Sequence, residues 1–312
     1  MSSEDPIQHD SGGHIISPSY GYWPTQWVCY TFVVLFFVTT LLHLGQSIRY
    51  RMWWLLPTAM LAGIGEAIGW AGRLWSSYDP LNGNGFLIQI VCTIIAATPL
   101  VGALFITFGR VVVCLGDQYS RLPSALYSKV FFTIDFVALL VQSTGGGIAA
   151  TAGPDHASSQ LGSNIMLAGI VFQLASLTVF CALVIEYVWR YYEGRPLRPS
   201  LVRMSSGASG GTSSNKPRII KPLKMLLVGL SAETTFLYIR AVYRTIELAD
   251  GFTGKIIRTE VWFNVFDAAM VVLAMYTLNA CHPGRLLGKA AKVHEAAMPL
   301  VTKNSRRVNT VV

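Results

Sequence analysis

Seven apolar stretches, each about 20 residues long, recur along this chain. A helix needs about 20 residues to cross the ~30 Å hydrocarbon core of a bilayer, so each stretch is long enough to span one. The sequence therefore predicts an all-α fold, a polytopic membrane bundle of seven transmembrane helices with its termini on opposite sides. The stretches run Trp23–Leu44, Met52–Gly72, Phe86–Phe108, Val130–Ala150, Ser163–Glu186, Leu223–Tyr243 and Glu260–Cys281.

Basic residues are concentrated on alternate connections. With Lys224 counted at the edge of the fifth connection, 19 of the 24 Lys and Arg lie after stretches one, three and five or in the C-terminal tail. The positive-inside rule then places the N-terminus outside and the C-terminus in the cytosol. We expect a polar extracellular segment at 1–22, a transmembrane domain at 23–284 with a flexible cytosolic loop at 190–222, and a basic cytosolic tail at 285–312.

The composition excludes several classes of protein. A chain that is 52% hydrophobic and 13% charged is too apolar for a soluble domain. Its net charge of +8 follows the cytosolic loops, so we expect contact with anionic inner-leaflet lipid and no nucleic-acid partner. None of the five cysteines forms a Cys-x-x-Cys pair and the sequence has no P-loop. We therefore expect no cofactor and no metal, and ATP can drive this chain only through a partner.

Ionisable residues recur inside the predicted spans, where each one must face the bundle interior, a partner or water. Their spacings of seven, four and three residues place those of each span on one helical face. The second span carries Glu66 and Arg73, the sixth carries Glu233, Arg240, Arg244 and Glu247, and the seventh carries Glu260, Asn264 and Asp267.

Two interpretations of these charges stay open. They form a structural ion network that locks the helices together, or they line an outward-facing cavity for the headgroup of an amphiphile. In the second case Glu260 and Asp267 would hold a cationic amine, while Arg240 and Arg244 balance the empty site. We also expect Glu66 to pair with Arg73 or with an arginine of the sixth span, because an unpaired buried carboxylate is unfavourable.

The fourth span carries a second polar line. Asp135 is followed seven residues later by Gln142 and then by three glycines, 145–147. The glycines would let another helix or a ligand approach the backbone closely. Gln173 on the fifth span is positioned to form a hydrogen bond with Gln142, which we interpret as structural.

The order and spacing of these residues resemble the fungal lipid-translocating exporters, seven-span proteins first associated with resistance to aminocholesterol. Two positions depart from the family pattern, since Trp70 and Asn264 stand where the family usually has Tyr. The matching segments are Glu66-x-x-Gly69-Trp70-x-x-Arg73, Pro99 with Gly109-Arg110, Asp135 with Gln142, Gly169 with Gln173, Arg240-x-x-Tyr243-Arg244-x-x-Glu247, Gly251-x-x-Gly254, Glu260, Asp267 and His282-Pro283-Gly284.

The resemblance implies a plasma-membrane protein, not an enzyme, that moves sphingoid bases, phospholipids, sterol-like drugs or similar amphiphiles and contributes to stress or drug resistance. Two other classes stay open. A seven-span receptor or sensor of lipid asymmetry needs no fixed motif, although the Asp-Arg-Tyr and Asn-Pro-x-x-Tyr receptor patterns are missing from spans three and seven. An intramembrane lipid hydrolase would use several histidines for zinc, and only His43 and His282 lie near the membrane.

Overall fold

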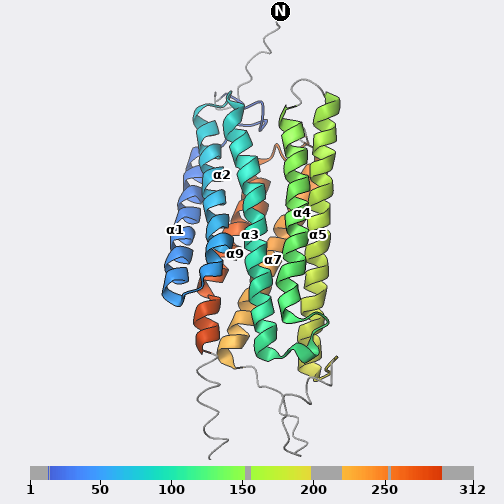
Figure 1. Cartoon of the computed structure of the whole chain (residues 1–312). Coiled ribbons are helices and arrows are strands. Elements are labelled where there is room, and N and C mark those ends of the chain that lie inside the picture. The colour runs from blue at the N-terminus through green and yellow to red at the C-terminus, as the bar shows by residue number, and fades with distance from the viewer. Residues whose placement is uncertain (1–12, 14, 152–155, 198–219, 252–253, 290–312) are drawn as a thin grey trace, which may run out of the picture.

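The computed structural model describes residues 13, 15–151, 156–197, 220–251 and 254–289. Most of the predicted N-terminal segment (1–22), cytosolic loop (190–222) and tail (285–312) lies outside these residues. The described part is all-α, with seven helices side by side in one elongated bundle (Figure 1). The predicted fold class is confirmed in this respect.

All the helices except the last extend beyond the predicted apolar stretches at one or both ends. Six of the seven helices in the described part are long and apolar enough to cross a membrane. The exception is α2, because its 18 residues include Glu66, Arg73 and several glycines. The helices are α1 (Gln26–Tyr50), α2 (Leu61–Tyr78), α3 (Gly83–Leu115), α4 (Ser124–Thr151), α5 (His156–Glu193), α7 (Lys221–Asp250) and a last helix made of α8 (Glu260–Phe263), η4 (Asn264–Ala269) and α9 (Met270–Ala280).

Local chemistry explains several helix boundaries. Pro57 lies in a short π-helical segment, η2 (Leu56–Met60), that precedes α2. Proline has no N–H to donate and therefore disturbs the regular ladder there. Gly116 and Gly251 end α3 and α7 with φ angles of 114° and 80°, which are positive values that glycine tolerates best.

The seven helices form a closed ring around the bundle axis. Helices α1, α2, α3, α4 and α5 each pack against the next in this order. Helix α5 packs against α7, α7 against α9, and α9 against α1. In addition, α3 contacts α7 across the interior. We call the end that carries residues 15–25 the upper end and the end where α1 stops at Tyr50 the lower end (Figure 1).

The distribution of polar and apolar side chains is that of a membrane protein. Large apolar residues cover the outer surface, for example Ile185 at 69% exposure and Val261 at 64%. Charged residues instead lie in the interior, where Glu66 and Asp267 are each 0% exposed. An apolar surface of this extent is stable against lipid and unstable against water.

The lower half of the interior is an aromatic core. Ring centroids from α3, α4 and α5 lie 4.7–5.7 Å apart, mostly in edge-to-face geometry. Such contacts add to the energy of burial alone. They join α3 to α4 and α5 below the polar region, through Phe105, Phe108, Tyr127, Phe131, Phe180 and Tyr187.

Helices α4 and α5 approach each other through glycines. A Cβ atom at Gly145 would overlap the backbone of Met166 and Gly162, and one at Gly169 would lie 2.6 Å from Cγ of Gln142. By contrast, nothing lies within 4 Å of a Cβ built at Gly147. The expectation that the glycine run permits close helix packing is confirmed at Gly145.

The Gly145→Ala change should destabilise the protein by about 1–3 kcal/mol, because the methyl group overpacks the α4–α5 contact. Thermal unfolding of the purified protein in detergent measures this. Gly147→Ala is the matched control on the same helix, and it should leave the midpoint unchanged or raise it slightly. Equal midpoints for the two variants would contradict the close contact.

Candidate functional site

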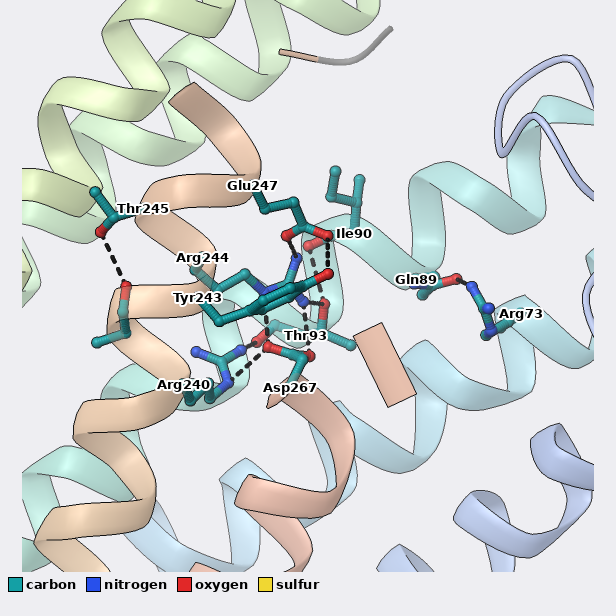
Figure 2. Close-up of polar contacts among 11 residues, drawn as sticks. Arg73, Gln89, Ile90, Thr93, Arg240, Tyr243, Arg244, Thr245, Glu247 and Asp267 are labelled. Carbon is teal, nitrogen blue, oxygen red and sulfur yellow. Dashed lines mark hydrogen bonds and ion pairs between the residues drawn. The ribbon is translucent and has the colours of Figure 1, made fainter. Parts of the chain in front are cut away.

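A buried ion network joins α7 to the last helix in the upper half of the bundle (Figure 2). The Asp267 carboxylate accepts two hydrogen bonds from Arg244, from Nε at 2.7 Å and Nη2 at 2.8 Å. Nε of Arg240 forms an ion pair with the same carboxylate at 3.0 Å. Asp267 lies in the π-helical segment η4, and such segments are frequent at functional sites.

The network continues to Glu247 and to α3. Glu247 accepts hydrogen bonds from Arg244 Nη1 at 3.1 Å and from the Tyr243 hydroxyl at 2.9 Å. Arg240 donates to the backbone oxygen of Thr93 at 2.9 Å, and Arg244 donates to its hydroxyl at 3.1 Å (Figure 2). Two arginines thus face two carboxylates, so the cluster is close to neutral and ties three helices together.

A second, partly buried ion pair lies nearer the upper end. Arg73 contacts Glu260 at 3.1 Å and donates to Gln89 at 3.2 Å and to the Tyr22 hydroxyl at 2.8 Å. Glu260 also accepts from the backbone N–H and the hydroxyl of Thr25, at 3.0 and 2.7 Å. These contacts fix the segment before α1 onto the bundle.

Aromatic rings surround the Arg73 guanidinium at centroid distances of 5.0–5.5 Å, a geometry that favours a cation. Phe263 also lies 5.1 Å from the Arg244 guanidinium and therefore connects the two ion pairs. Tyr20, which precedes the membrane-spanning part, donates to Gln89 at 2.5 Å, and burial raises its pKa to about 12. The rings are Tyr20, Tyr22, Trp70 and Phe263.

Several buried carboxylate oxygens are without a hydrogen-bond partner among the residues that the structure describes. Within the long helices they are both oxygens of Glu66, both of Asp135 and Oε1 of Glu233. Among the described residues Glu66 forms no close ion pair, because Arg73 contacts Glu260, and Arg240 and Arg244 contact Asp267. The two arginines of α7 act on the Glu66 carboxylate only through longer-range electrostatic attraction. Residues on one face of a single helix need not meet when a neighbouring helix offers a closer partner.

An interior cavity of about 40 Å³ lies between α3, α4, α5 and α7. Arg240 and Arg244 line it from α7, and Asp135 and Gln142 line it from α4. The predicted contact is confirmed here, since Gln142 donates to Gln173 at 3.0 Å. Gln173 in turn donates to Thr98 of α3 at 3.4 Å.

The structure brings together some of the predicted site residues and separates others. Arg240, Arg244, Glu247 and Asp267 form one cluster, as their spacing predicted. Glu260 belongs to the Arg73 pair instead. The side-chain oxygen of Asn264 is buried without a hydrogen bond within the described part of the chain, and Glu233 lies lower on α7, outside the cluster.

Sequence reasoning missed the neutral partners of these charges. On α3, Thr93 and Gln89 accept hydrogen bonds from three arginines, yet no charge or motif in the sequence indicates either residue. A lone glutamine in an apolar stretch was the one available indication. Tyr20 and Tyr22 lie in a polar segment that gave no indication of packing against the bundle.

The Asp267→Asn change should lower stability by about 3–5 kcal/mol, because it leaves two buried arginines undercompensated. Arg244→Gln should also destabilise, and the double variant should lose less than the sum of the two. Thermal unfolding in detergent measures all three. Arg121→Gln, at an exposed ion pair with Glu186, is the control and should change nothing measurable. Strict additivity of the two buried changes would contradict the pairing.

Comparison with known proteins places this architecture in a family. Residues 59–290 match the family described as RTA1-like protein. The sphingoid long-chain base transporter RSB1 of Saccharomyces cerevisiae (strain ATCC 204508 / S288c) is 28% identical over 269 residues, which cover 81% of this chain and 70% of the relative.

Two further relatives come from the same yeast strain. Protoporphyrin uptake protein 1 is 23% identical over 295 residues, covering 83% of this chain and 90% of the relative. Protein RTA1 is 23% identical over 234 residues, covering 75% of this chain and 66% of the relative. No solved structure matches. The resemblance inferred from the spacing of the intramembrane charges is confirmed, and the chain belongs to the RTA1-like family.

Proposed function

We propose that this protein moves amphiphiles, with sphingoid-type amines as the first candidates, across the plasma membrane and thereby contributes to stress or drug resistance. The main supporting observation is an interior cavity whose largely apolar wall carries the polar side chains of Asp135, Gln142, Arg240 and Arg244, in a bundle whose outer surface is apolar. A polar interior lowers the barrier for a headgroup, while the tail stays in lipid. The relative RSB1 is a sphingoid long-chain base transporter, which supports this choice of substrate.

The ion network and the transport role are compatible. Asp267 and Glu247 neutralise Arg240 and Arg244, so the network fixes α3, α7 and the last helix around the cavity. Both arginines also line the cavity, where a guanidinium can contact a phosphate or hydroxyl oxygen. The network then acts as the scaffold of a site whose other wall is α4 and α5.

Transport is tested with the purified protein in liposomes, with a panel of fluorescent sphingoid bases and phospholipids, with and without an ion gradient. We expect labelled amphiphile to become accessible on the opposite leaflet faster than in protein-free liposomes. Binding without movement would favour a receptor or sensor, and release of a cleaved product would favour a lipid hydrolase. If the protein neither moves nor binds any of the probes, the proposal is contradicted.

We further propose that the upper end of the bundle faces the outside and the lower end faces the cytosol. Arg51, Arg121 and Arg190 follow or end helices at the lower end, as the positive-inside rule requires of a cytosolic surface. The described residues of the basic loop and tail, 190–197, 220–222 and 285–289, also lie at the lower end by helix direction.

The orientation predicts that a protease site inserted within 204–215 resists protease added to intact cells and is cleaved after permeabilisation. The same site inserted within 1–12 is the matched control and should be cleaved in intact cells. Immunoblotting of the fragments distinguishes the two. The reverse pattern would overturn the orientation.

A further inference from the structure

A long groove runs along the outer side of the contact between α3 and α4 in the upper half of the bundle. Its volume is about 730 Å³, within the range of small-molecule sites. The α3 wall is apolar and extends from Phe86 to Ile95, about 14 Å by helical rise. Gly146 and Gly147 form part of the α4 wall.

The glycines of α4 have two different roles. Gly145 packs against α5, whereas a Cβ at Gly147 would meet nothing within 4 Å, and one at Gly146 would only touch Met166 at 3.5 Å. Bulk is therefore missing on the side of α4 that lines the groove. A helix face that is bare next to an apolar wall leaves space for an alkyl chain.

The groove adjoins the interior cavity. Ile94 and Gln142 line both spaces. Gln142 therefore lies at their junction, held there by its hydrogen bond to Gln173. A molecule in the groove would reach the cavity past the side chains of Ile94 and Gln142, without separation of the close α4–α5 contact.

The cavity is small, which limits the headgroup that it accepts. Its volume is about 40 Å³, and roughly 10–15 Å³ is enough for one water molecule. A primary ammonium with a neighbouring hydroxyl fits such a space. A phosphodiester headgroup with its substituents does not.

The charge balance of the cavity favours a cation. Arg240 and Arg244 are compensated by Asp267 and Glu247. Asp135 also lines the cavity and is 1% exposed, and neither of its oxygens has a hydrogen-bond partner at bonding geometry in the described part. Its polar neighbours are Ser176 and Gln173, which are neutral. Asp135 is thus the cavity-lining charge that lacks a counter-ion in this region of the described bundle.

We infer that the α3–α4 groove and the Asp135 cavity together form a lateral binding site for a single-chain primary amine. The alkyl chain lies in the groove against α3, the ammonium binds the Asp135 carboxylate, and a hydroxyl of the ligand contacts the Gln142–Gln173 amides. This inference rests on the proposed function and adds where the ligand enters, between α3 and α4, and which residue selects its charge.

The test uses the full chain in liposomes and two probes with the same chain, a long-chain primary alkylamine with a fluorophore at the chain end and its neutral, bulkier N-acetyl amide. The wild-type protein should bind the amine more tightly than the amide. Asp135→Asn should weaken amine binding about tenfold or more and leave amide binding unchanged, because a charge-assisted hydrogen bond is lost. Asp79→Asn, at the exposed end of α2, is the matched control and should behave as wild type.

The groove is tested separately. Gly147→Leu fills it without touching α5, so it should weaken both probes equally, whereas Gly45→Leu on the exposed face of α1 should weaken neither. A photoreactive amine, with its reactive group in the chain, should label α3 between residues 86 and 95 of the wild-type protein. This labelling requires no variant and therefore decides the case even if Asp135→Asn fails to fold.

The outcomes separate the site from the function. If the wild-type protein moves the amine, and Asp135→Asn and Gly147→Leu move and bind it equally well, the lateral site is wrong and the transport role stands. Labelling confined to the lipid-facing surfaces of α1 or α5 would overturn the site in the same way. If the wild-type protein neither binds nor moves any amphiphile, the proposed function itself fails.

Discussion

The structure depends on the double pairing of the Asp267 carboxylate with Arg240 and Arg244. An unpaired ion in a bilayer is very unfavourable, and the favourable term is large only when geometry is good and the remaining donors are satisfied. Here Arg244 approaches Asp267 with two donors, and the other guanidinium donors reach Glu247 and Thr93. The pairing therefore fixes the rotation of α7 against the last helix and against α3, which sets where every other interior residue lies.

The two halves of the bundle are packed differently as a result. Below the network, edge-to-face rings such as Phe108 and Phe180 pack α3, α4 and α5 against one another. Above and beside it, glycines and amides replace the rings, and the cavity and the groove appear. The polar half is also covered at its upper end, where Tyr22 and Thr25 bind the Arg73–Glu260 pair. The cavity is thus covered from above, and from the side only the Ile94 and Gln142 side chains lie between it and the groove.

The sequence predicted the number of helices and the facing of the charges better than it predicted their partners. Spacing along one helix determines a face, and Arg240, Arg244 and Glu247 do share one. The partner depends on the rotation and height of a neighbouring helix, which periodicity does not encode, so Arg73 meets Glu260 rather than Glu66. Neutral partners such as Thr93 could not be predicted for a different reason. A threonine in an apolar stretch is common, so its presence does not indicate a hydrogen bond to an arginine.

In the described part of the long helices, three carboxylates have unpartnered oxygens and pose the same energetic problem, and their surroundings distinguish them. Glu66 lies within electrostatic reach of Arg240 and Arg244, so part of its charge is already balanced. Glu233 lies lower on α7 and borders neither of the two spaces described above. Asp135 alone of the three lines a cavity, and that cavity adjoins a groove long enough for an alkyl chain. Burial makes all three unusual, but access to open space makes Asp135 the carboxylate that a mobile cation can reach.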